Sequence, residues 1–306
     1  MAFTAQDVKD LREKTGCGMM DCKKALTASD GDVEKAIEFL REKGLAAAAK
    51  KSGRVAAEGV VCTMVDYEKK VGVVIEVNSE TDFVGKNADF ISFVEACAKT
   101  VIDENPADVE ALMNCKMGDE TVDQALKELI LVIKENIKVR RFVRYEGVCS
   151  AYVHGGGTHG ILVNFETTND IDAKDEFVAY GKDIAMQVAA ANPGYVDEAS
   201  VPAEVVAKEK EIMLAQMAGD PKNANKPDAV KQKMIEGKIK KFFKENCLVD
   251  QEFVKDGDLT VAQYTAKVAK DLGGDIKIVK FTRFQKGEGL EKRADDFAAE
   301  VASMVK

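Results

Sequence analysis

Residues suited to catalysis are scarce in this chain. Of its 306 residues only two are histidines, His154 and His159, and both lie in the segment YVHGGGTHG. The sequence has no phosphate-binding loop of the GxxxxGK[ST] type and no GxSxG turn of the kind that carries a nucleophilic serine. An acid–base role for the histidines would need a nucleophile, and their loop offers only Thr158. The sequence therefore indicates a protein that is not an enzyme.

Cysteines are few and scattered. There are seven, an odd number at irregular spacings, which favours free thiols in a reducing compartment over a disulfide framework. Cys17 and Cys22 lie five positions apart with no histidine nearby, which favours small buried residues over a metal site. No cysteine or acidic cluster adjoins His154 and His159 either. We therefore expect no metal and no cofactor, and we interpret the histidine segment as a flexible hairpin tip.

Long apolar runs are absent as well. No segment approaches the roughly 20 residues of a membrane span, and the start MAFTAQDVKDL lacks the features of a signal peptide. The net charge of −9 disfavours nucleic acid as a direct partner. We expect a cytoplasmic protein with no membrane partner, and a length of 306 residues predicts two domains or more.

Residues 1–54 are predicted to form a small helical domain and a linker. Thr4 and Asp7 resemble a capping box, and Gly16 ends the first helix. The run MMDCKKALTAS gives a second helix. After the turn SDGD, VEKAIEFLREKG gives a third helix that ends at Gly44, followed by an Ala/Lys-rich linker.

The rest of the chain contains an internal duplication. VNSET at 77–81 recurs as VNFET at 163–167. Each copy follows a β-hairpin pattern, precedes an amphipathic helix that ends at Asn-Pro, and closes with a similar strand, IKVRRFVRY or IKIVKFTRF. We therefore predict an α+β fold whose core has two antiparallel-sheet and helix subdomains, residues 55–147 and 148–284.

The copies differ in length. The second carries roughly 53 extra residues, mainly within 202–250, where apolar residues follow helical spacing on two arms around a polar turn. This pattern predicts a protruding antiparallel helical hairpin with surface left for a further contact. Its seam is predicted to contain Val205, Val206, Ile212, Met213, Val230, Met234, Ile235, Ile239 and Phe242.

The copies also differ directly after the repeat. The first continues from Thr81 with DFVGK, and the second continues from Thr167 with TNDI. A phenylalanine at a helix start usually belongs to the core. The second copy lacks an aromatic residue there, which favours a function for Phe83 unless Ile171 is a smaller equivalent. The residues alone leave both interpretations open.

Two consecutive methionines, Met19 and Met20, lie in the turn before the predicted second helix. Adjacent positions of a helix cannot both face one core. At least one of them should therefore offer exposed, adaptable contact surface, and the alternative is that both pack inside the bundle.

Several segments occur together and in a family's order: LREKTGCGMMDCKKAL, EVNSETDFV, HGGGTHGILV, EGKIKKF and EKRADDFAAEVASM. Through them essentially the whole chain resembles the bacterial elongation factor Ts family. The resemblance implies a UBA-like N-terminal bundle, a two-part core, an inserted coiled-coil hairpin and a C-terminal helical module at 285–306. It also implies a guanine-nucleotide exchange factor that binds elongation factor Tu, displaces its Mg²⁺ and promotes GDP release.

The resemblance implies the contact residues too. The segment that wedges into the GTPase near its magnesium site is matched by Thr81, Asp82, Phe83 and Val84. The N-terminal contacts with the GTPase domain are matched by Arg12, Met19 and Met20. The loop that faces the partner's far domain is matched by His154 and Gly155. Relatives often carry a basic residue where this chain has GTH at 157–159, which leaves a charge role of that loop open.

Two other functions stay open at this point. A chain with a UBA-like bundle could be a scaffold or a chaperone-like adaptor, and a pull-down dominated by a single GTPase would argue against that. A small-molecule enzyme would have to use the His154 and His159 loop. Family members differ in whether two heterodimers pair, and the sequence leaves this pairing open.

Overall fold

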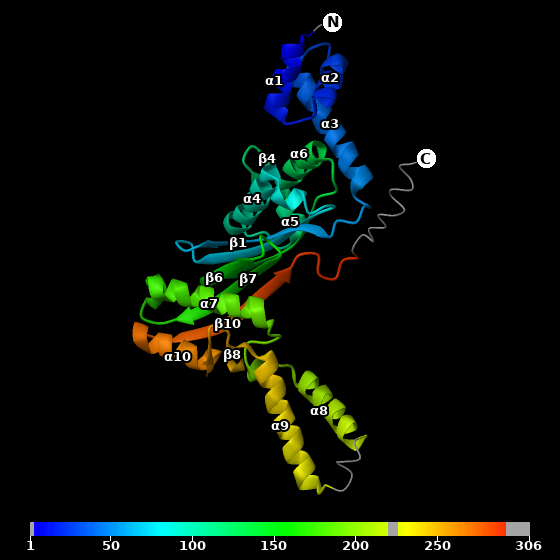
Figure 1. Ribbon diagram of the computed structural model, residues 1–306. Coiled ribbons are helices and arrows are strands. Elements are labelled where there is room, and N and C mark those ends of the chain that lie inside the picture. The colour runs from blue at the N-terminus through cyan, green and yellow to red at the C-terminus, as the bar shows by residue number, and fades with distance from the viewer. Residues whose placement is uncertain (1–2, 220–225, 292–306) are drawn as a thin grey trace.

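The computed structural model describes residues 3–219 and 226–291, which form a helical bundle, a two-sheet core and a helical hairpin inserted in the second half of the core (Figure 1). The mixture of helices and antiparallel sheets confirms the α+β class. Of the predicted C-terminal helical module, residues 286–291 form turns and irregular backbone, and residues 292–306 lie outside the described residues. The division into domains and the likeness of the bundle to UBA domains stay predictions.

Three helices make up the N-terminal bundle: α1 (Ala5–Thr15), α2 (Met19–Ala28) and α3 (Val33–Lys51). The predicted capping box is confirmed, because Thr4 and Asp7 exchange hydrogen bonds at the start of α1. Gly16 ends α1 in the left-handed conformation, where a glycine costs least. The bundle core includes Leu131 of the helix α6 (Val122–Ile133), so the bundle packs on the core domain.

The prediction that the third helix ends at Gly44 was wrong. Helix α3 continues to Lys51 because the alanine-rich run after Gly44 has high helix propensity. Gly44 instead lies against α6, where an added Cβ would be 3.3 Å from the carbonyl oxygen of Lys127. The glycine permits a close helix–helix approach and does not stop the helix.

The core contains two three-stranded antiparallel sheets. The first has the order β1-β2-β5, with β1 (Glu58–Asp66), β2 (Val71–Ser79) and β5 (Lys138–Glu146). The second has the order β10-β7-β6, with β6 (Val148–His154), β7 (His159–Thr167) and β10 (Ile276–Gln285). The repeated VNxET segments lie at the ends of the two middle strands. Each third strand carries a bulge, at Arg140 and at Val279.

Equivalent helices cover the two sheets. Helices α4 (Ala88–Glu104) and α6 pack on the first sheet, and α7 (Asp175–Ala191) and α10 (Val261–Leu272) pack on the second. Short elements complete each half: α5 (Val109–Asn114), β3 (Lys116–Met117) and β4 (Glu120–Thr121), then β8 (Glu252–Phe253) and β9 (Asp256–Thr260). Helices α4 and α7 both end at a left-handed asparagine, as the Asn-Pro pairs predicted.

The two sheets pack against each other through the faces that the helices leave free. A small apolar cluster of Val61, Val74, Cys149, Leu162 and Phe284 fills the interface. The contact is close because Gly72 has no side chain: an added Cβ would lie 2.6 Å from the Cδ1 of Leu162. As a result, β2 is buried along its whole length, by helices on one face and by the second sheet on the other.

The helical hairpin projects from the second sheet (Figure 1) and consists of α8 (Ala203–Ala218) and α9 (Asp228–Asn246). Its apolar cluster contains Val206, Met213, Met217, Met234, Ile235, Ile239 and Phe243. The prediction was wrong for Ile212 and Val230, which are exposed, and Val205 and Phe242 lie outside the cluster. Ile212, Val205 and Phe242 each adjoin a member of the cluster, and only one residue of an adjacent apolar pair can face the other helix. Within the described ranges, no helix combines the length and the apolar character needed to cross a bilayer.

Candidate functional site

Phe83 is the most exposed large apolar residue of the described chain, with 79% of its surface accessible. It lies in the loop between β2 and the short 3-10 helix η1 (Val84–Lys86). The next residue, Val84, is buried in the core under the first sheet. Leaving a phenylalanine in water forgoes roughly 1.5–3 kcal/mol of burial free energy. The interpretation of Phe83 as a core residue is therefore wrong, and its ring is accessible to another molecule.

The backbone before Phe83 is held by two carboxylates. Thr81 donates two hydrogen bonds to Glu135, from its backbone N–H at 2.9 Å and from its hydroxyl at 2.6 Å. Glu80 accepts a hydrogen bond from the backbone N–H of Asn136 at 2.6 Å. Both ties reach the connection between α6 and β5, so the loop is fixed to the body of the first copy.

A close glycine contact fixes η1 from below. An added Cβ on Gly85 would lie 3.0 Å from the carbonyl oxygen of Gly59 in β1. Gly59 itself has φ +109°, and an added Cβ there would lie 2.2 Å from the carbonyl oxygen of Val77. The helix turn can therefore lie directly on the strand backbone. Phe83 therefore lies on a rigid seat, meaning a loop and η1 that are fixed to the strands below. Little conformational entropy of this loop would be lost when another molecule binds.

The second copy builds this loop differently. Its 3-10 helix η2 (Ile171–Ala173) begins with Ile171, which is fully buried. Ile171 therefore corresponds to Val84, and it is not the smaller equivalent of Phe83. Asn169 and Asp170, at φ +58° and +51°, occupy the place of Phe83. Asn169 donates a hydrogen bond to the carbonyl oxygen of Gly273 at 2.8 Å, so this loop is closed by polar contacts and presents no large exposed apolar residue.

The glycine turn between β6 and β7 carries His154 and Gly155, both exposed. The backbone N–H of Val61 in β1 donates to the carbonyl oxygen of Gly157 at 2.8 Å, and that of Lys286 donates to Thr158 at 2.8 Å. The prediction of a flexible tip is corrected, because hydrogen bonds hold the turn on two sides.

The two histidines flank this turn, with ring centroids 6.2 Å apart. The Nδ1 atom of His154 lies 3.1 Å from the hydroxyl of Tyr152. Burial, helped by the charge of Arg283, lowers the pKa of His159, which favours its neutral form. Among the described residues no group of three or more His, Cys, Asp or Glu side chains is placed to hold a metal ion. The turn therefore presents the His154 ring and glycine backbone at the surface.

A groove of about 300 Å³ separates the Phe83 loop from this turn. Its lining includes Val60, Cys62, Gly85, Ile91, Val153 and Gly157. Gly85 directly follows the predicted segment 81–84, and Val153 and Gly156 flank His154 and Gly155, so both predicted segments border the groove without lining it. Burial raises the pKa of the Cys62 thiol to about 11, so this thiol is protonated at neutral pH.

Ile91 and Val153, at the groove, are exposed apolar residues that the sequence reasoning missed. A signal was present for Ile91, which lies off the buried face formed by Phe90, Phe93 and Val94 in the amphipathic α4.

The remaining predicted contacts lie on the N-terminal bundle, which contributes no residue to the lining of this groove. Met19 and Met20 are 55% and 62% exposed, so the alternative that both pack inside the bundle is wrong. Arg12 is exposed on α1.

Asp21 forms an ion pair between this bundle and the first copy of the core. Its carboxylate accepts hydrogen bonds from Lys43 at 2.7 Å and from Lys134, at the end of α6, at 3.2 Å. The Lys43 hydrogen bond, with help from Lys134 and against the effect of burial, lowers the pKa of Asp21. Asp21 therefore joins the bundle to the first copy of the core.

Comparison with known proteins gives a single family. The protein family described as "Elongation factor TS" matches this chain over residues 80–288. The chain is 48% identical over 307 residues to "Elongation factor Ts" of Clostridium botulinum (strain Eklund 17B / Type B), covering 99% of both chains. It is 49% identical over 308 residues to the protein of the same name from Clostridium perfringens, with 99% of both chains covered, and 50% identical over 304 residues to that from Clostridium novyi, with 97% covered.

Proposed function

Because the chain belongs to the elongation factor Ts family, we propose that it is a guanine-nucleotide exchange factor for elongation factor Tu and acts in translation in the cytoplasm. The observation that carries the proposal is Phe83, an exposed aromatic residue on a rigid seat that only the first copy of the core presents. An exchange factor needs contact surface and no nucleophile, which agrees with the scarcity of catalytic residues in the sequence.

The proposed mechanism is a linkage between two binding events. A GTPase holds its nucleotide through Mg²⁺ and through the backbone N–H groups of its phosphate-binding loop. Phe83 supplies apolar bulk that enters the partner beside the magnesium site and moves the ligands of the ion. By reciprocity, bound nucleotide weakens the binding of the exchange factor by the same factor. GDP therefore leaves, and GTP rebinding expels the exchange factor.

The other predicted residues have supporting roles in this proposal. Thr81 fixes the loop through Glu135, Asp82 lies at its exposed tip, and Val84 anchors it in the core. Arg12, Met19 and Met20 provide a second contact with the GTPase domain. His154 and Gly155 provide a third, with the far domain of the partner. Pairing of two such heterodimers stays an expectation, which the mass of the purified complex tests.

The test is release of labelled GDP from purified elongation factor Tu, with and without this protein. Phe83→Ala should slow the stimulated release by at least about tenfold, equivalent to about 1.4 kcal/mol, while leaving the fold intact. Tyr67→Ala is the matched control, because Tyr67 is also an exposed aromatic of the first sheet, in the β1–β2 turn. Stopped-flow traces that are the same for Phe83→Ala and the unchanged protein would overturn the proposal.

A further inference from the structure

A buried carboxylate in the first sheet has no counterpart in the second. Glu76 lies in the middle of β2 with none of its surface exposed, and the corresponding residue of β7 is Leu162, also buried. A buried charge is costly unless donors surround it. Burial raises the pKa of Glu76, but hydrogen bonds from Gly287, Asn78 and Arg141 outweigh it and the net effect is a lowered pKa. Glu76 is therefore an ionised acceptor at neutral pH.

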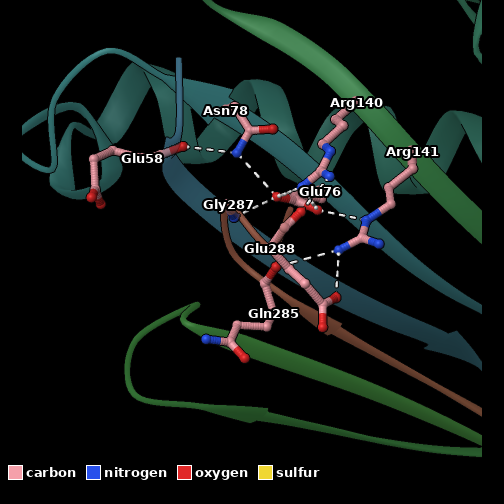
Figure 2. Close-up of polar contacts among 8 residues, drawn as sticks. All are labelled: Glu58, Glu76, Asn78, Arg140, Arg141, Gln285, Gly287 and Glu288. Atoms are coloured by element: carbon pink, nitrogen blue, oxygen red, sulfur yellow. Dashed lines mark hydrogen bonds and ion pairs between the residues drawn. The ribbon is translucent and has the colours of Figure 1, made fainter. Parts of the chain in front are cut away.

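Four donors converge on this carboxylate (Figure 2). Arg140 Nη1 lies at 3.0 Å, Arg141 Nε at 2.7 Å, Asn78 Nδ2 at 3.1 Å and the backbone N–H of Gly287 at 2.8 Å. Consecutive residues of a regular strand point to opposite faces, so two adjacent arginines would not normally meet one acceptor. The bulge at Arg140 removes this restriction and lets both reach Glu76.

The same arginines hold the turn that follows β10. Arg140 Nη2 donates to the carbonyl oxygen of Glu288 at 2.5 Å, and Arg141 Nη2 donates to that of Gln285 at 3.3 Å (Figure 2). Gly287 has φ +69°, and an added Cβ would lie 2.3 Å from the carbonyl oxygen of Ala57. A side chain at this position would therefore lift the turn off the first sheet.

This turn connects both sides of the groove. It leaves the second sheet through β10 and lies against β1 and β2 of the first. Lys286 donates from its backbone N–H to Thr158 in the glycine turn at 2.8 Å, and its Nζ lies 2.5 Å from the carboxylate of Glu58. Residues 285–288, which we name the clasp, therefore tie the glycine turn to the strand on which the Phe83 loop is seated.

We propose that the clasp, as the second attachment of the His154–Gly155 turn beside the Val61–Gly157 hydrogen bond, keeps this turn at a fixed distance from Phe83, and that Glu76 is its positioning residue for partner binding. This inference rests on the proposed function. Each sheet has its own helix-covered core, so loss of the clasp leaves both folded. The partner would then have to bring the two contact segments together as it binds, which weakens affinity. The maximal release rate should change little, because the seat of Phe83 lies outside the clasp.

The first measurement is hydrogen exchange of the clasp amides by mass spectrometry. Glu76→Leu introduces the residue that the second copy carries, and Gly287→Ala disrupts the clasp from the other side with Glu76 in place. Both should speed exchange in the peptide 285–290 by at least about tenfold while the β2 and β7 amides stay protected. Glu166→Leu is the control, because Glu166 forms an exposed pair with Lys277 and should leave the clasp unchanged.

The second measurement is labelled-GDP release at increasing concentrations of each variant. Both clasp variants should raise the half-saturating concentration by about fivefold to tenfold with less than about a twofold change in maximal rate. Phe83→Ala should instead lower the maximal rate. Unchanged clasp exchange, or faster clasp exchange with an unchanged half-saturating concentration, would overturn the inference. If Phe83→Ala also leaves release unchanged, the proposed function itself fails, and the exchange data still report on the clasp.

Discussion

The two copies of the core use the same framework for different purposes. Both have a three-stranded sheet with a bulged third strand, a 3-10 turn, a long helix with an asparagine end and a capped helix before the last strand. The two copies differ at positions that contact solvent, the other sheet or the N-terminal bundle. The first copy exposes Phe83, buries Glu76 and receives the N-terminal bundle at Lys134. The second has Asn169 and Asp170, Leu162 and Gly273 at these places and carries the helical hairpin.

This contrast separates residues that maintain the fold from residues that contact other molecules. Val84 and Ile171 occupy the same buried position in both copies, so that position serves the fold. Phe83 has no apolar counterpart in the second copy and is exposed, as the proposed contact with a partner requires. A duplicated domain therefore contains an internal control for each such residue.

The largest expected effect is a loss of stability at the buried position that Val84 and Ile171 share. Ile171→Ala should lower the free energy of unfolding by about 2–5 kcal/mol, because it removes a fully buried side chain and leaves a cavity. Phe83→Ala should change it by less than about 0.5 kcal/mol, because an exposed side chain contributes little to stability. Denaturant unfolding of both variants measures the difference. Equal losses would show that the two loops are not divided into scaffold and contact surface.

A smaller effect tests the attachment of the N-terminal bundle to the first copy. The folded-state pKa of Asp21 is lowered, so its contribution is present above the unfolded pKa near 4 and is lost as the pH falls through the lower folded value. Asp21→Asn should cost about 0.5–1 kcal/mol at pH 7. Unfolding curves of the two proteins should differ at pH 7 and converge at an acidic pH below the lowered folded-state pKa of Asp21.

The matched control for this prediction is Asp10→Asn, on the exposed surface of α1. A cost for Asp21→Asn that is the same at both pH values would contradict the ion-pair explanation. The second copy has Gly273 at the position of Lys134, and within the described ranges no such bundle packs on it, so no equivalent pH dependence is expected there.

The smallest effect concerns the insertion in the second copy. Removal of residues 206–245 with a short linker should change the stability of the core by less than about 1 kcal/mol, because the hairpin packs on its own cluster. Circular-dichroism melting measures this. A core that no longer melts cooperatively would show that the hairpin is part of the fold of the second copy.

Local and repeated patterns explain what the sequence could predict. The capping box at Thr4, the hairpins and the asparagine helix ends depend on residues a few positions apart. The duplication then allowed the two copies to be compared, which indicated the strands that they share and the position of the insertion in the second copy. Exposure of at least one of Met19 and Met20 followed from helix geometry alone.

The predictions failed where the deciding contact is distant or where the copies differ in length. Gly44 was predicted to end a helix. A glycine is needed there because the carbonyl oxygen of Lys127 lies close by, and Lys127 belongs to another helix that the local sequence does not reveal. Ile171 was considered an equivalent of Phe83 because the second loop is one residue longer, and only the structure places the extra residue. The importance of Glu76 was not visible, because its partner Gly287 lies 211 positions away.

That separation also determines the order in which the chain can finish folding during its own synthesis. Domains generally fold from the N-terminus as the chain emerges, and contacts between distant residues form late. Glu76 emerges 211 residues before Gly287, so the first sheet must assemble while its central carboxylate still lacks its last donor. Until Gly287 is made, the Glu76 carboxylate in β2 is more stable in contact with water than buried between the sheets. Closure of the two sheets over β2 is therefore a late event, completed only when almost the whole described chain has been made.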